Sequence, residues 1–295
     1  MESEGLGPAV QRAILIQELR RLRSIKGETQ EQVARARGWS VSKFIRIENG
    51  VAHVTKSDLE GLLRHYGEKD QRRVDELIDL AKGARRPNWW DGVYDGGDKA
   101  FEAYLGYEDG AATIRVSQLA VVPGVLQIES YMRLALQAYG APEDQIETSI
   151  NLRLKRQERM LKRAPGQTYL LDEAILDRPV GDVMAGQLRH LLQVADRPEV
   201  EIRIVPKSAG LHFGLLGPFV LLGFGSLLED VVYIEGRKAD LLIAERGAVG
   251  ADAGSIGYPD DEVAGYQDGF ERLRTIALGP QDSLDRIDQA IRDMC

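Results

Sequence analysis

The chain has 295 residues, of which 43% are hydrophobic and 28% charged, and these values suit a globular protein of about two domains. No apolar run reaches the roughly eighteen residues of a membrane span, and the opening MESEGLGPAV lacks the basic and apolar regions of a secretory signal. The formal net charge of −8, averaged over the whole chain, argues against nucleic-acid binding.

The cysteine and histidine content argues against disulfide frameworks and metal sites. The only cysteine, Cys295, can build neither a disulfide framework nor a metal site, and it fits a reducing cytoplasm. His53, His65, His190 and His212 do not fall in the spacings of zinc hydrolases. We therefore expect a cytoplasmic protein with no metal, no cofactor and no membrane association.

The charge is unevenly distributed along the chain. Residues 1–86 contain 17 Lys and Arg against 13 Asp and Glu, a net +4, which leaves −12 for the remainder. A basic head on an acidic body is typical of a regulator whose body must not adhere to nucleic acid.

Five short helices are predicted for residues 1–86. The first, over residues 9–26, has Leu15, Leu19 and Leu22 on one stripe and ends at Gly27. Thr29 is placed to cap a second helix, QEQVARAR, in a capping box with Gln32.

Beyond Gly38, Ser40 is placed to cap a third helix, VSKFIRIE, which Asn49-Gly50 terminates. Apolar spacing predicts two more helices, one around residues 59–66 and one around residues 74–81. The sequence therefore predicts a small all-helical domain.

The second and third helices are joined by only a few residues, which predicts a helix-turn-helix. On the third helix, Phe44 and Ile47 are expected to face the core. The opposite stripe carries side chains able to reach bases and phosphates: Ser42, Lys43, Arg46 and Asn49. Taken alone, this stripe also fits an ordinary solvated surface.

The run LRSIKGETQEQVARARGWSVSKFIRIENG resembles the Xre (Cro/cI-type) helix-turn-helix family, with Ile45 where that family usually has Ser. The resemblance implies a phosphate contact for Gln30, base contacts for Ser42 and Lys43, and a base or backbone contact for Arg46. It also implies a structural ion pair between Arg23 and Glu48. The candidate DNA-contacting residues are Thr29, Gln30, Ser40, Ser42, Lys43, Arg46 and Asn49.

Residues 87–110, rich in Gly, Asp and aromatics, are expected to form a joint in which Trp89 and Trp90 serve burial. For residues 111–295 the pattern predicts a larger mixed α+β domain. Strands are expected in residues 111–122, 168–176, 199–206, 217–224, 230–236 and 240–245. Helices are expected over residues 129–139, 142–162, 183–195, 260–277 and 280–294, with Phe270, Leu273, Ile276 and Ala277 inward on the fourth.

This body resembles the C-terminal domain of unknown function of actinobacterial Xre-type regulators, the WhiJ-like group, through stretches such as NWW, VVPGVLQIESYMRLAL and LDEAILDRPVG. Ile128 replaces a usual Thr, and residues 237–257 are longer and richer in glycine than in that group. The resemblance implies a small companion protein as partner. A homodimer is expected because a DNA-binding regulator of this kind sets two recognition helices in successive major grooves.

Residues 153–163 hold six Lys and Arg against the single Glu158. They suggest contact with a ligand or partner through Arg153, Arg156 and Arg159, with a solvated helix face as the simpler alternative. His212, in the glycine-rich GLHFGLLGPF, is a further candidate ligand contact.

Asp172, Glu173 and Asp177 could serve acid–base or metal chemistry, but they lack a nearby nucleophile motif and are better explained as turn and surface residues. We predict no catalytic residue. The sequence favours a regulator that binds a double-stranded DNA operator, with a body that dimerises and receives a small-molecule ligand or a companion protein. An antitoxin-like binder and an enzymatic body are the alternatives.

Overall fold

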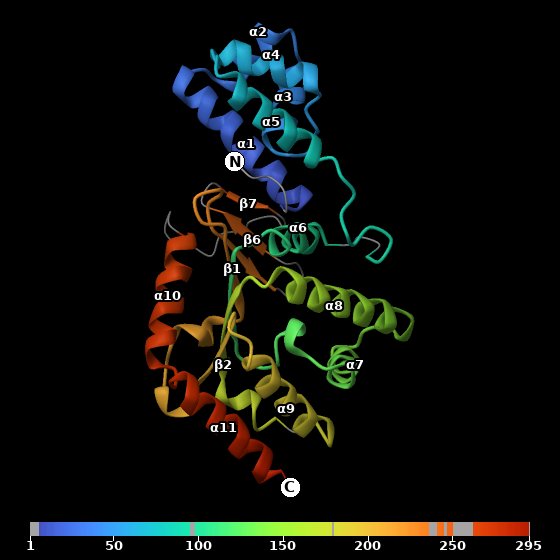
Figure 1. Cartoon of the computed structure of the whole chain (residues 1–295), viewed down its shortest axis with the longest axis vertical. Coiled ribbons are helices and arrows are strands. Elements are labelled where there is room, and N and C mark those ends of the chain that lie inside the picture. The colour runs from blue at the N-terminus through green and yellow to red at the C-terminus, as the bar shows by residue number, and fades with distance from the viewer. Residues whose placement is uncertain are drawn as a thin grey trace. The chain divides into compact units, whose positions relative to one another are not determined.

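The computed structural model describes residues 6–94, 98–178, 180–235, 241–244, 247–249 and 262–294. Contacts divide the chain into two units. One comprises Met1–Trp89, Leu105–Gly110 and Gly225–Leu228, and the other comprises Trp90–Tyr104, Ala111–Phe224 and Glu229–Cys295. The first unit is helical and the second is built on a sheet (Figure 1), as the predicted α+β class requires.

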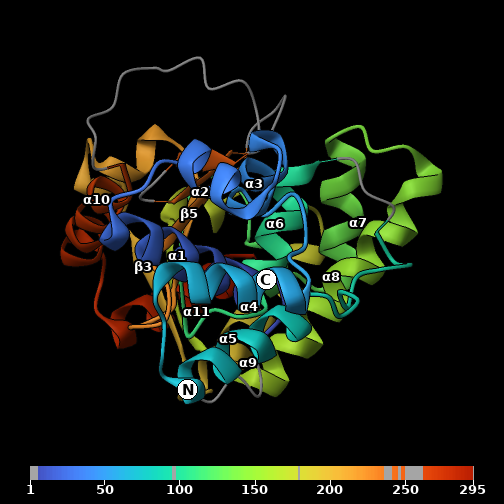
Figure 2. The ribbon, with the colours of Figure 1, turned by 90° about the horizontal axis from the view of Figure 1, so that it is seen from above.

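Five helices lie entirely within the first unit: α1 (Pro8–Lys26), α2 (Gln30–Arg37), α3 (Val41–Glu48), α4 (Lys56–Tyr66) and α5 (Gln71–Gly83). Figure 2 shows α2 and α3 next to each other, and they pack together in the structure. Leu19, Phe44 and Leu59 are fully buried between the helices. Burial of their apolar side chains is the main stabilising contribution to this unit.

The ends of α2 and α3 follow the predicted capping. The Thr29 hydroxyl accepts a bond from the Gln32 backbone N–H, and the Gln32 side chain accepts one from the Thr29 N–H. Ser40 Oγ accepts a bond from the Lys43 backbone N–H. Gly38, at φ 66°, ends α2 in the left-handed region that glycine adopts without steric penalty. The sharp turn between the two helices therefore follows from local sequence.

The second unit contains a mixed sheet in the order β3-β2-β1-β4-β5-β6-β7. Its strands are β1 (Thr113–Gln118), β2 (Gly166–Asp172), β3 (Val200–Val205), β4 (Phe219–Gly223), β5 (Val231–Ile234), β6 (Leu241–Ala244) and β7 (Gly247–Val249). β1, β2 and β3 pair in parallel, and β4 to β7 continue the sheet antiparallel. Parallel neighbours need long crossovers, which explains why helices lie between β1 and β2 and between β2 and β3.

Helices flank this sheet. The crossovers contain α7 (Glu129–Ala138), α8 (Glu143–Arg163) and α9 (Val183–Ala195), and α10 (Glu262–Ile276) and α11 (Pro280–Asp293) follow the strands. Both views place α10 on one side of the sheet and α7 and α8 on the other (Figures 1 and 2). Phe270 and Leu273 of α10 pack into the same core cluster as Leu170, Phe219 and Val232.

The outer edge of β3 is closed by the connection to α11. Ser283 Oγ accepts a bond of 3.0 Å from the Ile204 N–H, and the Leu278 N–H donates to the Ile204 carbonyl at 2.8 Å. An edge strand with unpaired backbone groups invites aggregation, so these bonds protect the β3 edge at this position.

Several expectations need correction. The helix α6 (Lys99–Glu108) occupies part of the predicted joint, since its aromatic and alanine residues pack well on a helix. β2 ends at Asp172, whose side chain caps the 3-10 turn η2 (Glu173–Ile175) in place of a longer strand. Ile276 is exposed, not inward. β7 was not expected, and most of residues 237–257 lie outside the described residues.

Two glycines of α10 provide a matched test of packing. An alanine Cβ at Gly269 would lie 2.5 Å from Phe213 Cδ1, whereas nothing lies within 4 Å of one at Gly265. The Phe213 ring is held by edge contacts with Phe219 and Tyr266, so it cannot move freely. We expect Gly269→Ala to lower the free energy of unfolding by about 1–3 kcal/mol and Gly265→Ala to raise it by up to about 1 kcal/mol.

Urea unfolding of the full chain, followed by circular dichroism, measures both changes. An equal gain in stability from the two substitutions would contradict the tight packing of Phe213 on α10.

Candidate DNA-binding surface

The two faces of α3 differ sharply in exposure. Phe44 and Ile47 are buried in the helical core, as predicted. Ser42, Lys43 and Arg46 are exposed on the helix surface. The structure thus presents the predicted stripe to solvent and fixes the opposite side of the helix by burial.

A buried carboxylate anchors the end of α3. Glu48 has 0% exposure. Arg23 of α1 binds it bidentately, with Nε 2.7 Å from Oε1 and Nη2 3.0 Å from Oε2. Gln30 Nε2 donates to Oε2 at 2.7 Å. These three residues, with Arg20, whose Nη2 donates to the Glu48 carbonyl at 2.5 Å, join α1, α2 and α3.

The electrostatics of this group follow from the pairing. The hydrogen bonds to Glu48 raise the pKa of Arg23 above its ordinary value. Burial, with the Glu48 charge as a second cause, raises the pKa of Tyr66. Two-point binding of a carboxylate by a guanidinium is among the stronger polar contacts in proteins. The pairing of Arg23 with Glu48, implied by the family resemblance, is therefore present in the structure.

Gln30 lies differently from its implied role. Its amide nitrogen is committed to Glu48, so that group is directed into the protein and not outward to a phosphate. Thr29 and Ser40 use their hydroxyls as helix caps. Asn49 Oδ1 accepts a bond from Arg20 Nη2 at 3.1 Å. The side chains of these four candidates therefore make hydrogen bonds within the helical unit itself.

Lys43 makes two contacts that the sequence pattern did not reveal. Its Nζ lies 3.0 Å from Asp58 Oδ2 of α4 and 4.1 Å from the ring centroid of Trp39. Trp39 lies four residues before Lys43, in the turn that precedes α3, so this contact is local in the sequence. Asp58 is fifteen residues from Lys43, and only the packing of α4 brings it near.

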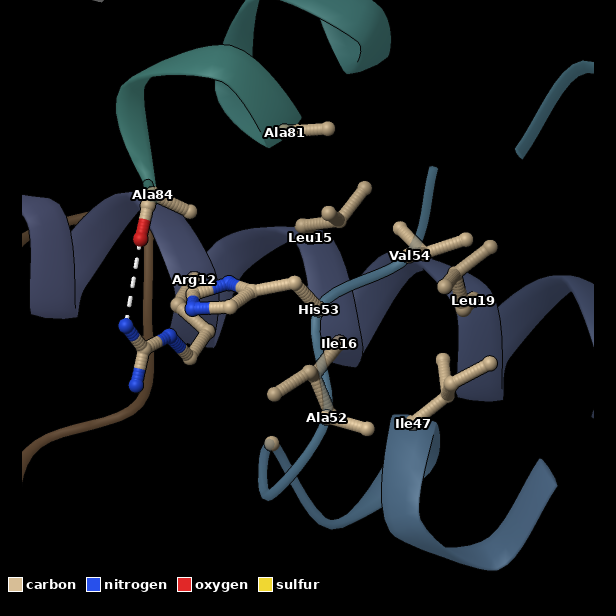
Figure 3. A pocket seen from close by; sticks show the side chains of 11 residues that line it. Arg12, Leu15, Ile16, Leu19, Ile47, Ala52, His53, Val54, Ala81 and Ala84 are labelled. Carbon is tan, nitrogen blue, oxygen red and sulfur yellow. Dashed lines mark hydrogen bonds between the residues drawn. The ribbon is translucent and has the colours of Figure 1, made fainter. Parts of the chain in front are cut away.

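A small pocket lies behind α3, and Figure 3 shows its lining. The lining residues are Arg12, Leu15, Ile16, Leu19, Ile47, Gly50, Ala52, His53, Val54, Ala81 and Ala84. Arg12 Nη2 donates to the Ala84 carbonyl at 3.1 Å (Figure 3). The volume of about 20 Å³ suits one water molecule rather than a metabolite, so we assign no ligand to it.

The basic segment of the second unit is not a simple solvated face. Arg156 is 9% exposed, its Nη2 lies 3.2 Å from the Tyr104 hydroxyl, and its guanidinium lies 5.9 Å from the centroid of the Phe101 ring. Arg153 is half-buried and donates to Gln127 Oε1 at 2.9 Å. Burial lowers the pKa of Arg153, and the Arg156 charge adds to that effect. Arg159 is half-buried on the same helix.

His212 is also directed inward. Its side chain is 7% exposed and its Nε2 lies 3.8 Å from Asp172 Oδ2. Its Nδ1 is buried and has no hydrogen-bond partner among the described residues. The structure therefore brings His212 close to Asp172. The contacts described for Arg153 and Arg156 are with Gln127 and Tyr104 instead.

The carboxylates Glu173 and Asp177 form ion pairs. Arg286 Nε lies 2.6 Å from Glu173 Oε1, and Arg286 Nη2 lies 3.4 Å from Asp177 Oδ1. Lys207 also pairs with Asp177. Burial alone would raise the pKa of Glu173, but the bonds from Lys207 and Arg286 outweigh it and the pKa is lowered. Within the described residues, no group of three or more His, Cys, Asp and Glu side chains is placed to hold a metal ion.

Comparison with known protein families finds a match for each of the two parts of the chain. A helix-turn-helix domain matches residues 15–77, and a domain of unknown function (DUF5753) matches residues 101–289. No curated protein and no solved structure shows significant similarity to the chain. In the described part of the chain, no helix has the length and apolar character needed to cross a membrane.

The Glu48 cluster, defined as Glu48 with Arg23 and Gln30, is testable by truncation. Glu48→Ala leaves the Arg23 guanidinium without its carboxylate, and we expect a loss of about 3 kcal/mol in the free energy of unfolding. Glu31→Ala removes an exposed carboxylate from α2 and should change it by less than about 0.5 kcal/mol. Urea unfolding provides the measurement, and similar values for both variants would contradict the anchoring role.

The ion pairs of Arg286 predict a dependence of stability on pH. The hydrogen bond from Lys207 lowers the pKa of Asp177, and burial opposes this effect without cancelling it. The pKa of Glu173 is lowered as well. A carboxyl whose pKa is lowered by folding stabilises the fold at any pH above its ordinary pKa, near 4. This stabilisation is lost as the pH falls through the lowered pKa of the folded state.

Arg286→Gln returns the two pKa values toward normal. We therefore expect the variant to be less stable than wild type at pH 7 and to lose less stability between pH 5 and pH 3. Thermal unfolding across this range measures the difference. Arg272→Gln removes an exposed pair with Asp268 and serves as the control. A pH profile of Arg286→Gln that runs parallel to wild type would refute the linkage.

Proposed function

Because the chain belongs to the family of the domain of unknown function (DUF5753) and carries a helix-turn-helix domain, we propose that it is a transcriptional regulator that binds a double-stranded DNA operator in a sequence-specific manner. The observation that carries this proposal is the exposed stripe of α3, backed by the buried Phe44, Ile47 and Glu48. A rigid helix with donors on its outer face suits the major groove.

The proposed contacts divide into two classes. Ser42, Lys43 and Arg46 read base edges or adjacent phosphates from the middle of α3. Thr29, Gln30 and Ser40 lie at helix N-termini, where backbone N–H groups attract phosphate oxygens. Asn49, at the C-terminal end of α3, is proposed to contact the DNA backbone through its side-chain amide. The net +4 of residues 1–86 favours the approach to DNA, and the net −12 of the rest keeps the body away from it.

We assign the second unit to assembly and control. In this proposal the chain is an Xre-type regulator of the actinobacterial, WhiJ-like kind that works as a homodimer in the cytoplasm. Two copies of α3 then enter successive major grooves about 34 Å apart. The arginines Arg153, Arg156 and Arg159 and the inward His212 are the proposed points at which a small-molecule ligand or companion protein acts on this unit.

Substitutions on α3 test the DNA contacts. A duplex selected from random sequence by the wild-type chain provides the operator probe. We expect Lys43→Ala and Arg46→Ala each to weaken operator binding by about 5- to 150-fold, because one good base contact contributes about 1–3 kcal/mol. Fluorescence anisotropy measures the affinity.

The control is Lys82→Ala, which removes an exposed charge from α5, where Lys82 pairs with Asp79. It should leave operator affinity within about twofold of wild type. Wild-type affinity in both α3 variants would remove this surface from the proposal.

A further inference from the structure

The ammonium group of Lys43 is held between two neighbours. Asp58 Oδ2 lies 3.0 Å from Nζ on one side, and the face of Trp39 lies 4.1 Å away on another. The three residues come from α3, α4 and the turn before α3, and all belong to the first unit. These two contacts favour one placement of a long side chain that would otherwise sample many rotamers before any ligand arrives.

The pair remains open to solvent. The Lys43 and Asp58 side chains are 43% and 24% exposed. An ammonium group carries three donors, and Asp58 takes one of them. The remaining donors are free to bond with an acceptor that approaches the exposed side. Guanine offers two such acceptors in the major groove, O6 and N7, and lysine is one of the residues that recognise them.

Asp58 has a second effect, on phosphate. Any phosphate that bonds to Lys43 comes within a few ångströms of the Asp58 carboxylate, and like charges at that distance repel. A neutral base edge does not suffer this repulsion. The Asp58 carboxylate, which orients Lys43, therefore weakens the contact of Lys43 with phosphate more than its contact with a base edge.

Asp58 is not required to cap its own helix. Thr55 Oγ1 accepts the bond from the Asp58 backbone N–H, and the Asp58 side chain is directed to Lys43 instead. Its acidic side chain is thus available for a role other than holding α4 together.

We propose that Asp58 is a specificity-determining residue that acts through Lys43: it positions the ammonium group for a guanine edge and weakens its attraction to backbone phosphate. This inference rests on the DNA-binding function proposed above and names the base that Lys43 reads.

The test compares Asp58→Asn with Glu60→Gln in the full chain. Glu60 lies two residues further on α4 and pairs with Lys56 at 3.7 Å, so its variant removes the same charge from the same helix without touching Lys43. Affinities are measured by fluorescence anisotropy for the selected operator and for a scrambled duplex over a range of salt concentrations. Thermal unfolding checks that both variants are folded.

For Asp58→Asn we expect binding to the scrambled duplex to tighten by about fivefold and its salt slope to steepen by about 0.9, the value of one added phosphate contact. Operator affinity should rise less, so the ratio of specific to non-specific affinity falls. Glu60→Gln should leave this ratio unchanged. Replacing operator guanines one at a time by 7-deazaguanine, which lacks N7, should weaken wild type at one position and Asp58→Asn less at that position.

A double-mutant cycle establishes the route of the effect. In a Lys43→Ala background, Asp58→Asn should no longer alter the affinity ratio. An unchanged ratio in Asp58→Asn, an equal change in Glu60→Gln, or a change that persists without Lys43 would each overturn the inference. Failure of the proposed function has a different signature, because the wild-type chain would then select no duplex sequence at all.

Discussion

The helical unit depends on one buried carboxylate. Glu48 sits without exposure at the end of α3 and is bound by Arg23 from α1 and Gln30 from α2. Removing a carboxylate from water is costly unless its oxygens are fully hydrogen-bonded. The helices therefore have to meet with the geometry that supplies these donors, and this requirement sets the orientation of α3. The outward stripe of α3 is a consequence of that inward constraint.

Much of the helical unit was predictable because its determinants are local. The Thr29 capping box and the Ser40 cap each act within a few residues, and both are present as the sequence indicated. The contact of Lys43 with Asp58 was not predictable in this way, since it joins different helices. Gln30 illustrates the same limit, because a residue type common at a DNA contact can equally donate into the protein, and only the position of Glu48 decides between them.

In the second unit, the periodicity of apolar residues predicted individual strands but not how they pair in the sheet. The strands β3, β4 and β5 were expected from their apolar, β-branched patterns, but their pairing order follows from long-range packing that no local pattern encodes. The pattern of residues 168–176 predicted one strand, but Asp172 caps η2 and the strand ends there. Arg156 was grouped with its charged neighbours by sequence, yet the aromatic rings of Phe101 and Tyr104 draw it inward.

The first unit is not one continuous stretch of chain. Leu105–Gly110 and Gly225–Leu228 belong to it together with Met1–Trp89. Val10 of α1 is fully buried, and an added Cβ at Gly110 would lie 2.2 Å from Val10 Cγ2, so the Gly110 backbone packs directly against the Val10 side chain. During synthesis the helices of this unit emerge well before the segment that covers Val10. A fragment ending at Trp89 would expose this apolar side of α1, so full stability of the helix-turn-helix waits on translation of the body.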